Sequence, residues 1–199
     1  MEKEMIIVLD FGGQYNQLIA RRVRECNVYC EVHPYTTPLD ELLAMKPKGI
    51  ILTGGPNSVY DMKSPHYDKK LFEAGVPILG ICYGAQLLAW SLGGKAETAP
   101  VSEYGKTDID IDRSGKLFGD VSEHTVGWMS HTDYIAALPE GFRKTGSTSV
   151  CPFAAFENDG AGLYAVQFHP EVTHTVEGMK VLSAFVYDIC GCRGDWKMS

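Results

Sequence analysis

The chain has 199 residues, with 18 lysines and arginines against 25 aspartates and glutamates, and a formal net charge of −7. This acidic balance argues against nucleic acid or an anionic membrane as the main partner. No apolar run reaches the roughly 18 residues of a membrane span, and the charged first residues are unlike a signal peptide. Length and composition therefore favour one cytoplasmic domain over residues 1–199.

The six cysteines are scattered along the chain and do not form the framework of a small secreted protein. This pattern agrees with a reducing cytoplasm. Cys190 and Cys192 form the one close pair in the second half of the chain, but no second ligand pair accompanies them. We interpret them as cysteines of the tail and expect no metal site there.

The first half of the chain alternates between strand and helix patterns. Residues 5–9 (MIIVL) are continuously apolar, as in a strand covered on both faces, and residues 15–23 have helical spacing. Residues 29–32 predict a second short strand. Thr37 and Pro38 then predict the start of a helix, with the threonine as cap and the proline in the first turn.

The same rhythm continues to about residue 94. Residues 49–53 (GIILT) predict a third buried strand, and residues 76–81 predict a fourth that leads into the helical pattern of residues 85–90. Repeated strand–helix units are typical of a parallel sheet with helices on both faces. The fold class is therefore α/β, with a single open, mostly parallel sheet.

The second half of the chain has a different pattern. Shorter alternating segments occur at residues 107–111, 125–129, 154–157 and 163–168, and a last helical pattern covers residues 176–189. We expect these strands to form a small antiparallel addition to the sheet. No linker or internal repeat divides the chain.

Cys82 lies in residues 80–84 (GICYG), between the fourth strand and the helix after it. A glycine-flanked strand-to-helix turn of this kind presents a nucleophile clear of the backbone. The positive N-terminus of the following helix favours the thiolate. A Cβ at Gly80 or Gly84 would collide where the strand folds back into the helix. The alternative for these five residues alone is a buried cysteine at an ordinary turn.

Two further segments follow predicted strands, at the sheet edge where open α/β proteins gather their chemistry. Residues 54–56 (GGP) follow the third strand, and the N–H groups of Gly55 and Tyr83 are candidates for an oxyanion hole. The alternative for residues 54–56 is a plain tight turn.

His169 and Glu171 follow the last predicted strand. A cysteine nucleophile needs a base, and that base needs a group that orients it, which are roles for His169 and Glu171. His174 suggests a metal site with the same two residues, but Pro170 forbids the helix that an H-E-x-x-H zinc site requires.

These segments resemble the three motifs of the class I glutamine amidotransferases, in order and over nearly the whole chain. The residues that carry the resemblance are 54–56 (GGP), 80–86 (GICYGAQ) and 168–171 (FHPE). It implies a flavodoxin-like α/β fold and hydrolysis of glutamine through a cysteine thioester. It also implies Cys82, His169 and Glu171 as the catalytic triad, Gly55 and Tyr83 as the oxyanion hole, and Gly54, Gln86, Ser130 and His131 as substrate contacts.

Within that family, four other segments resemble the glutaminase domains of GMP synthetases: residues 9–15, 128–131, 167–175 and 190–196. The resemblance implies an ATP-pyrophosphatase partner domain or subunit, which uses ATP and magnesium to aminate xanthosine monophosphate. It implies no cofactor in this chain, and a homodimer formed through the partner domain. The chain ends just after Trp196, so it is either a domain excised from a longer synthetase or a separate subunit. The Cys-Gly-Cys ending favours the excised domain.

Two positions depart from the family pattern. Ala85 stands where methionine is common, and Thr132 stands where glycine is expected beside the substrate loop. Thr132 brings the contacts of residues 130–133 into question, but not the triad. Three other functions stay open: a glutaminase for another synthase such as anthranilate synthase, a non-catalytic scaffold, and a general cysteine hydrolase.

Overall fold

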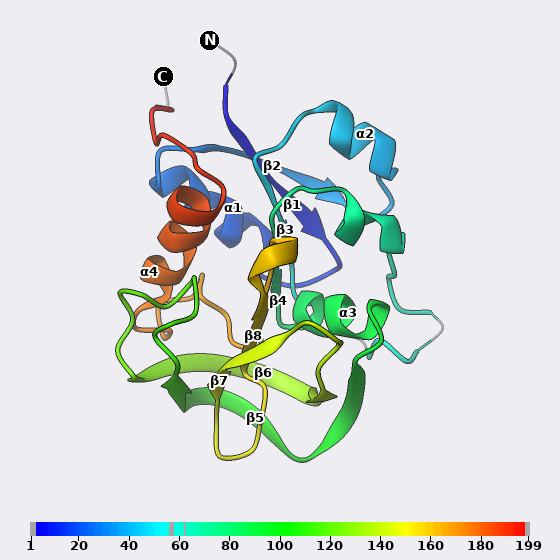
Figure 1. Ribbon diagram of the computed structural model, residues 1–199, viewed down its shortest axis with the longest axis vertical. Helices are drawn as coiled ribbons and strands as arrows, with labels where there is room; N and C mark the ends of the chain where they lie inside the picture. Colours follow the sequence, from blue (N-terminus) through cyan, green and yellow to red (C-terminus); the bar gives the residue numbers. More distant parts are fainter. Residues whose placement is uncertain (1–2, 56–57, 62, 198–199) are drawn as a thin grey trace.

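The computed structural model describes residues 3–55, 58–61 and 63–197. Within these residues a single nine-stranded sheet has the order β2-β1-β3-β4-β9-β8-β7-β5-β6, with helices on both faces (Figure 1). The strands are β1 (Met5–Asp10), β2 (Tyr29–Pro34), β3 (Gly49–Leu52), β4 (Ile78–Ile81), β5 (Lys95–Ile111), β6 (His124–Ala137), β7 (Arg143–Ser147), β8 (Ala155–Asn158) and β9 (Leu163–Val166). The helical segments are α1 (Asn16–Glu25), α2 (Leu39–Ala44), η1 (Lys69–Glu73), α3 (Tyr83–Ser91), η2 (Asp159–Ala161), α4 (Gly178–Ser183) and η3 (Ala184–Ile189).

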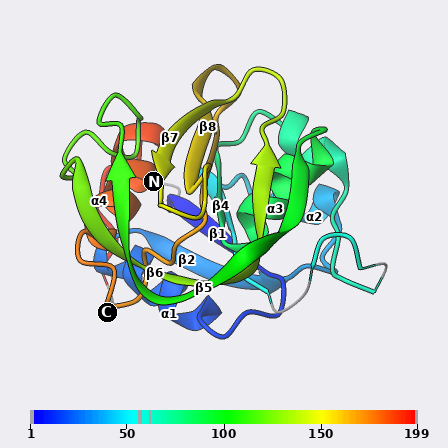
Figure 2. The ribbon, with the colours of Figure 1, turned by 90° about the horizontal axis from the view of Figure 1, so that it is seen from below.

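Strands β2, β1, β3, β4 and β9 are parallel, in the flavodoxin-like order that the resemblance implies. The pairs β9–β8, β8–β7, β7–β5 and β5–β6 are antiparallel. This part is larger than the expected small addition, because β5 and β6 extend over 17 and 14 residues. Seen from below, they form a long curved ribbon in front of the parallel strands (Figure 2). Much of β5 is exposed and therefore polar, which hides it from a search for apolar alternation.

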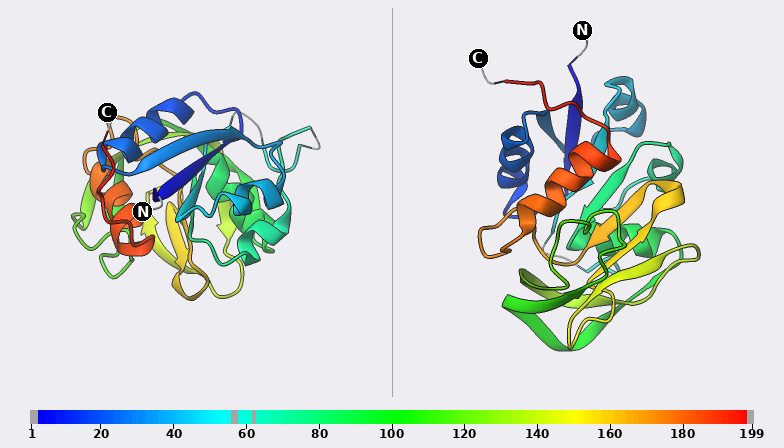
Figure 3. Two further views of the ribbon diagram at one scale, coloured as in Figure 1. Left: turned by 90° about the horizontal axis from the view of Figure 1, so that it is seen from above. Right: turned by 60° about the vertical axis from the view of Figure 1, so that its left-hand side comes forward.

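The parallel strands are apolar because both of their faces are covered. All residues of β3, β4 and β9 are buried, as are the first five residues of β1. Helices α1 and α4 pack on one face of the sheet and lie side by side there (Figure 3). Helices α2 and α3 cover the opposite face. Among the described residues, no helix is long and apolar enough to span a bilayer.

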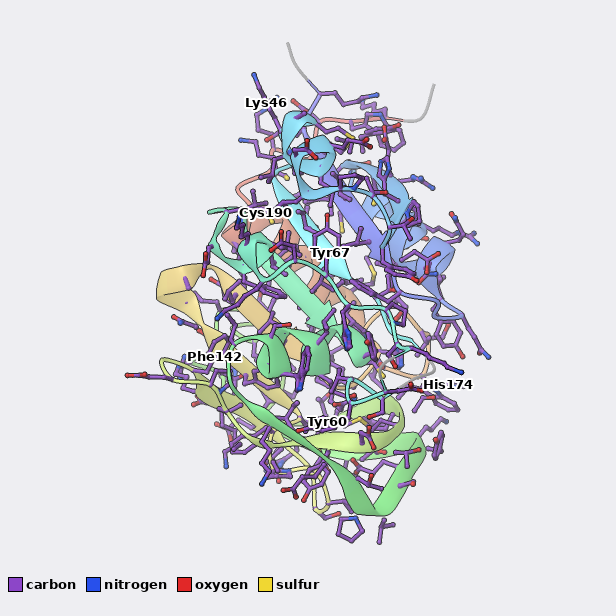
Figure 4. The ribbon with its side chains drawn as sticks, turned by 90° about the vertical axis from the view of Figure 1, so that its right-hand side faces the viewer. Lys46, Tyr60, Tyr67, Phe142, His174 and Cys190 are labelled. Atoms are coloured by element: carbon purple, nitrogen blue, oxygen red, sulfur yellow. The ribbon has the colours of Figure 1, made fainter. Side chains whose placement is uncertain are left out.

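Two local predictions are wrong. Helix α2 begins at Leu39, with Pro38 at the cap position, and no side chain caps it. Cys190 and Cys192, interpreted from the sequence as cysteines of the tail, are core residues. Cys190 lies so close to β3 that a Cβ on Gly49 would be 2.4 Å from its sulfur (Figure 4). Burial raises the pKa of the Cys192 thiol to about 11. All six cysteines are free thiols.

The crossing of β4 and α3 is very close, as the glycines of this turn predict. A Cβ on Gly84 would lie 2.4 Å from the Leu52 carbonyl oxygen, and one on Gly80 would lie 2.6 Å from the Gly84 carbonyl oxygen. Both clashes are with backbone atoms, which cannot turn aside as a flexible side chain can. The two glycines thus let the helix start directly against the sheet.

We expect Gly84→Ala to destabilise the protein, because the new methyl group must push β3 away from α3. Overpacking of this kind costs about 1–3 kcal/mol. For a chain of this length it corresponds to a melting temperature lower by about 2–12 °C. Thermal unfolding followed by circular dichroism measures the shift. Gly119→Ala is the matched control, since nothing lies within 4 Å of its Cβ position. Equal melting temperatures for both variants would contradict the crossing as described.

Candidate active site

Cys82 occupies the turn between β4 and α3 with φ 55° and ψ −110°, a conformation that residues with a side chain rarely adopt. Its N–H donates to the Val166 carbonyl at 2.9 Å, and its own carbonyl accepts from the N–H groups of Ala85 and Gln86. Neighbouring strand and helix thus hold the backbone in this strained shape. The turn has the geometry of a nucleophile elbow, as predicted.

The Cys82 side chain lines a cavity of about 480 Å³, which is within the size range of small-molecule sites. The cavity lies at the carboxyl ends of the parallel strands and against the β5–β6 ribbon. It is lined by all the site residues predicted from the sequence except Glu171, namely Gly54, Gly55, Cys82, Tyr83, Gln86, Ser130, His131 and His169. Pro56, the third residue of the Gly-Gly-Pro motif, is outside the described residues.

Glu171 lies behind His169 and is almost fully buried. Its carboxylate oxygens are 3.0 and 3.3 Å from Nδ1 of His169, so Nε2 is the ring nitrogen left for Cys82. Burial alone would lower the pKa of His169. The interactions with Cys82 and Glu171 outweigh that effect and hold its pKa well above the usual value of 6.5. His169 is therefore held in its charged form, between a sulfur and a carboxylate.

Residues outside the three amidotransferase motifs fix the position of His169. Its backbone N–H donates to the Trp128 carbonyl at 3.0 Å, and its carbonyl accepts from the Thr175 hydroxyl. The ring of Tyr15 lies edge-on to the imidazole, with 5.5 Å between ring centroids. Arg22 donates from Nε to the Glu171 carbonyl at 3.0 Å. The contacts of Trp128, Tyr15 and Arg22 join distant segments, so local sequence patterns do not predict them.

The candidate oxyanion hole lies where β3 and α3 approach each other. Tyr83 is the first residue of α3, so its N–H has no acceptor within the helix. A Cβ on Gly55 would lie 2.9 Å from the Phe11 carbonyl, and one on Gly54 would lie 3.2 Å from Cε1 of His169. Both glycines thus allow the loop to approach the site closely, and Gly54, Gly55 and Tyr83 line the same cavity as Cys82.

The β6 segment that contains Ser130 and His131 forms the opposite wall. The Cys82 sulfur is 3.7 Å from the Ser130 carbonyl. The His131 ring turns away from the cavity: Nδ1 is 2.7 Å from the Asp133 carbonyl and Nε2 is 2.9 Å from Glu103 Oε1. Since both ring nitrogens are engaged, the ring is not available to a ligand. The predicted substrate contact of His131 is therefore limited to its backbone.

Gln86 of α3 and Thr132 of β6 also line the cavity. Gln86 donates from Nε2 to the Asp133 carbonyl at 3.0 Å, which leaves its Oε1 as the polar atom for a ligand. The Thr132 hydroxyl is 2.8 Å from the Tyr104 hydroxyl at the exposed rim of the cavity. The departure at Thr132 therefore adds a contact at the rim and leaves the triad untouched.

Comparison with known proteins shows the family of the chain. The family described as glutamine amidotransferase class-I matches residues 7–189. The chain belongs to the class I glutamine amidotransferases. This result confirms the kind of enzyme expected from the sequence motifs.

The relatives and solved structures agree with this assignment. A glutamine-hydrolysing GMP synthase of Clostridium botulinum (strain Alaska E43 / Type E3) is 66% identical over 198 residues, and one of Caldicellulosiruptor saccharolyticus is 58% identical over 199 residues. All of the amidotransferase chain matches, but it spans only 39% of the length of each relative. A Thermoplasma acidophilum protein described as a GMP synthase subunit is 31% identical with a TM-score of 0.85, over 96% of this chain and 95% of its own. A Thermotoga maritima glutamine amidotransferase, 18% identical with a TM-score of 0.76 over 96% of this chain and all of its own, shares the fold.

We expect Glu171→Gln to lower the pH at which His169 loses its proton. The neutral amide removes one of the two groups that hold the pKa of this histidine high, so the imidazolium no longer persists into the alkaline range. NMR titration of the His169 ring signals measures the midpoint in both proteins. The ring signals of the exposed His124 serve as a control. An unchanged midpoint would mean that Glu171 does not set the charge of His169.

Proposed function

We propose that this amidotransferase domain hydrolyses glutamine to glutamate and ammonia, with Cys82 as nucleophile. The observation that carries the proposal is the strained backbone of Cys82, which directs its sulfur into a cavity beside the charged His169–Glu171 pair. Backbone strain at one residue costs of the order of 1–3 kcal/mol and is typically found where function requires it.

In the first step, the Cys82 thiolate attacks the side-chain amide carbon of glutamine, and the N–H groups of Gly55 and Tyr83 bind the oxyanion. His169 then gives its proton to the leaving nitrogen, so ammonia departs and a γ-glutamyl thioester remains. In the second step, His169 takes a proton from water, and the hydroxide attacks the thioester. The thiolate is regenerated, and the new carboxyl group passes its proton to ammonia or to solvent, which leaves glutamate. Glu171 orients the ring and stabilises its charged form in both steps.

The cavity supplies contacts for the rest of the substrate. Gln86 offers Oε1 as an acceptor, Gly54 lines the wall beside His169, and the backbone of Ser130 and His131 lies on the opposite side. Their roles as substrate contacts rest on this lining and on the family motifs. That the chain uses no cofactor of its own, and that it acts in the cytoplasm, stay predictions.

We further propose that the ammonia serves a GMP synthase. The relatives that match the whole chain are glutamine-hydrolysing GMP synthases, and the chain spans 39% of their length. In this scheme a partner with ATP-pyrophosphatase activity, either a domain or a subunit, uses ATP and magnesium to activate xanthosine monophosphate, and ammonia displaces the activated group. A homodimer formed through that partner belongs to the same proposal.

The first experiment tests the glutaminase site with a diazo-ketone analogue of glutamine, followed by mass spectrometry. We expect one adduct, on Cys82, which excess glutamine suppresses. Cys82→Ala should remove the adduct and lower glutamine turnover by more than about 1,000-fold, because no other group forms the thioester. Cys192→Ala is the control, because Cys192 is also buried but lies outside the cavity. Turnover that survives Cys82→Ala would overturn the assignment.

The second experiment tests the synthase. Adding the chain to the synthetase part of a GMP synthase relative should support glutamine-dependent formation of GMP from xanthosine monophosphate. The Cys82→Ala chain should support formation only when ammonia is supplied. Glutamine hydrolysis without any transfer to xanthosine monophosphate would point to another synthase, such as anthranilate synthase.

A further inference from the structure

Gln167 is a buried residue beside the nucleophile that the steps above do not use. It follows β9 directly, is 1% exposed, and is absent from the lining of the cavity. Its amide nitrogen Nε2 lies 3.6 Å from the Cys82 sulfur, within hydrogen-bond distance for a sulfur acceptor. Its amide oxygen Oε1 lies 3.2 Å from Nε2 of Gln86. Gln167 therefore contacts the reacting atom from the protein side.

The orientation of both amides is set by a backbone carbonyl. The Asp133 carbonyl can only accept hydrogen bonds, so the group of Gln86 that lies 3.0 Å from it must be the NH₂. The second hydrogen of that NH₂ then points to Gln167, so the Gln167 atom that accepts it must be the amide oxygen. The NH₂ of Gln167 is therefore the group that faces Cys82. A reversed amide would place two oxygens or two NH₂ groups against each other.

The Asp133 carbonyl is also hydrogen-bonded to the side chain of His131. Because this carbonyl only accepts, Nδ1 of His131 carries a hydrogen and donates to it at 2.7 Å. Nε2 of His131 is hydrogen-bonded to Glu103 Oε1 at 2.9 Å. Glu103 and His131 are directly opposite each other in the register of β5 and β6, and both side chains are almost fully buried.

The second oxygen of Glu103 is also fixed. The Thr148 hydroxyl accepts from the N–H groups of Val150 and Cys151, so its own hydrogen points to Glu103 Oε2 at 2.8 Å. Each group from Thr148 to the Cys82 sulfur thus has its donors and acceptors determined by the next. Such a chain is rigid, because reversing one member leaves buried polar groups unpaired.

We infer that Gln167 is a catalytic residue that donates a hydrogen bond to the Cys82 sulfur, and that Glu103 and His131 are positioning residues that fix this donor through the Asp133 carbonyl and Gln86. The inference deepens the proposed function and rests on it for the role of Cys82 as nucleophile. A hydrogen bond to a charged acceptor is stronger than one between neutral groups. The Gln167 amide therefore stabilises the thiolate without giving up a proton.

Glu103 and His131, together with Cys151, are also residue types that bind metals, and their ligand atoms lie within 4.8 Å of one another. Their hydrogen bonds favour the positioning role. Both ring nitrogens of His131 and both carboxylate oxygens of Glu103 already have protein partners. Burial raises the pKa of the Cys151 thiol to about 12, so its sulfur is protonated at neutral pH.

The first test compares Gln167→Met and Gln167→Glu with the wild-type chain at pH 8. Methionine removes the donor at similar length. Glutamate keeps the oxygen that faces Gln86 and puts a carboxylate oxygen in place of the donor. The readout is the rate at which iodoacetamide alkylates Cys82, followed by mass spectrometry without glutamine present. We expect a rate about tenfold lower for Gln167→Met, the scale of one hydrogen bond to a charged group, and a larger loss for Gln167→Glu.

Glutamine kinetics of the same variants add a second readout. Since Gln167 does not line the cavity, kcat should fall in parallel with alkylation while KM changes less than about threefold. Circular dichroism checks that each variant is folded. One folded variant is sufficient to test the role of Gln167. Alkylation and kcat equal to wild type in a folded variant would overturn the role of Gln167. If the wild-type chain does not turn over glutamine but alkylation falls as expected, the proposed function fails and the contact to Cys82 stands.

The second test addresses the positioning residues. Glu103→Leu leaves Nε2 of His131 without a partner and should slow Cys82 alkylation. Glu103→Gln should restore the rate to near the wild-type value, because an amide can donate to Nε2 and accept from Thr148. Glu157→Leu is the matched control: its carboxylate is equally buried and accepts from the Lys116 N–H, but it contacts no member of the chain of hydrogen bonds.

A double-mutant cycle completes this test. If Glu103 acts through Gln167, then Glu103→Leu should slow alkylation in the wild-type background and have no further effect in the Gln167→Met background. Equal effects in both backgrounds, or the same loss from Glu157→Leu, would mean that Glu103 only stabilises the fold. Either result would overturn the role of the positioning residues.

Discussion

The close crossing of β4 and α3 is the constraint on which the rest of the site depends. With no side chains at Gly80 and Gly84, the helix begins immediately after the strand, and Cys82 makes that turn at positive φ. The sulfur is then directed out of the sheet edge, next to the N-terminus of α3. The loop after β3 and the segment after β9 lie beside this sulfur because the parallel sheet aligns β3 and β9 with β4.

The antiparallel ribbon provides what the parallel sheet lacks. An open parallel sheet offers loops at its carboxyl edge but no wall facing them, and β5 and β6 supply that wall across the end of the molecule (Figure 1). The register of β5 and β6 is essential for the site, because a shift of β6 by one residue would place the His131 side chain on the face opposite to Glu103. The irregular pairing between Thr98 and Glu103 lies just before this position and sets the register there.

Local patterns in the sequence predicted the elbow and pointed to the residues proposed as the triad. Apolar strands, the glycines around Cys82 and the position of His169 after a strand are all local signals. In the structure Cys82 and His169 line one cavity, and Glu171 lies behind His169. Glu103 has no such signal. It lies in a polar, largely exposed strand, and only its pairing with His131, 28 residues away, gives it a role. Gln167 could be read only as part of the motif around His169, since its partners Gln86 and Cys82 are more than 80 residues distant.

The Cys190–Gly191–Cys192 segment illustrates the same limit in the opposite direction. Its residue types and its place in the chain led to the interpretation of Cys190 and Cys192 as cysteines of the tail. In the structure this segment packs on β3, which has a glycine, Gly49, next to the Cys190 sulfur. The interpretation fails because Cys190 and Cys192 are buried by contacts with segments that are distant in the sequence. The local sequence gives no signal of such contacts.

The two groups proposed to contact the Cys82 sulfur differ in one chemical respect. His169 holds a proton that it must deliver to ammonia, so after that step its ring is neutral and can activate water. Gln167 cannot lose a proton at any pH at which the protein folds, so its N–H remains a donor when the thiolate is released at the end of the cycle. A site with His169 alone would have to stabilise the returning thiolate with the same proton that it has just collected from water. A second, permanent donor separates the stabilisation of the sulfur from the movement of the proton. This explains why a polar chain reaching back to Glu103 is maintained in an otherwise apolar interior.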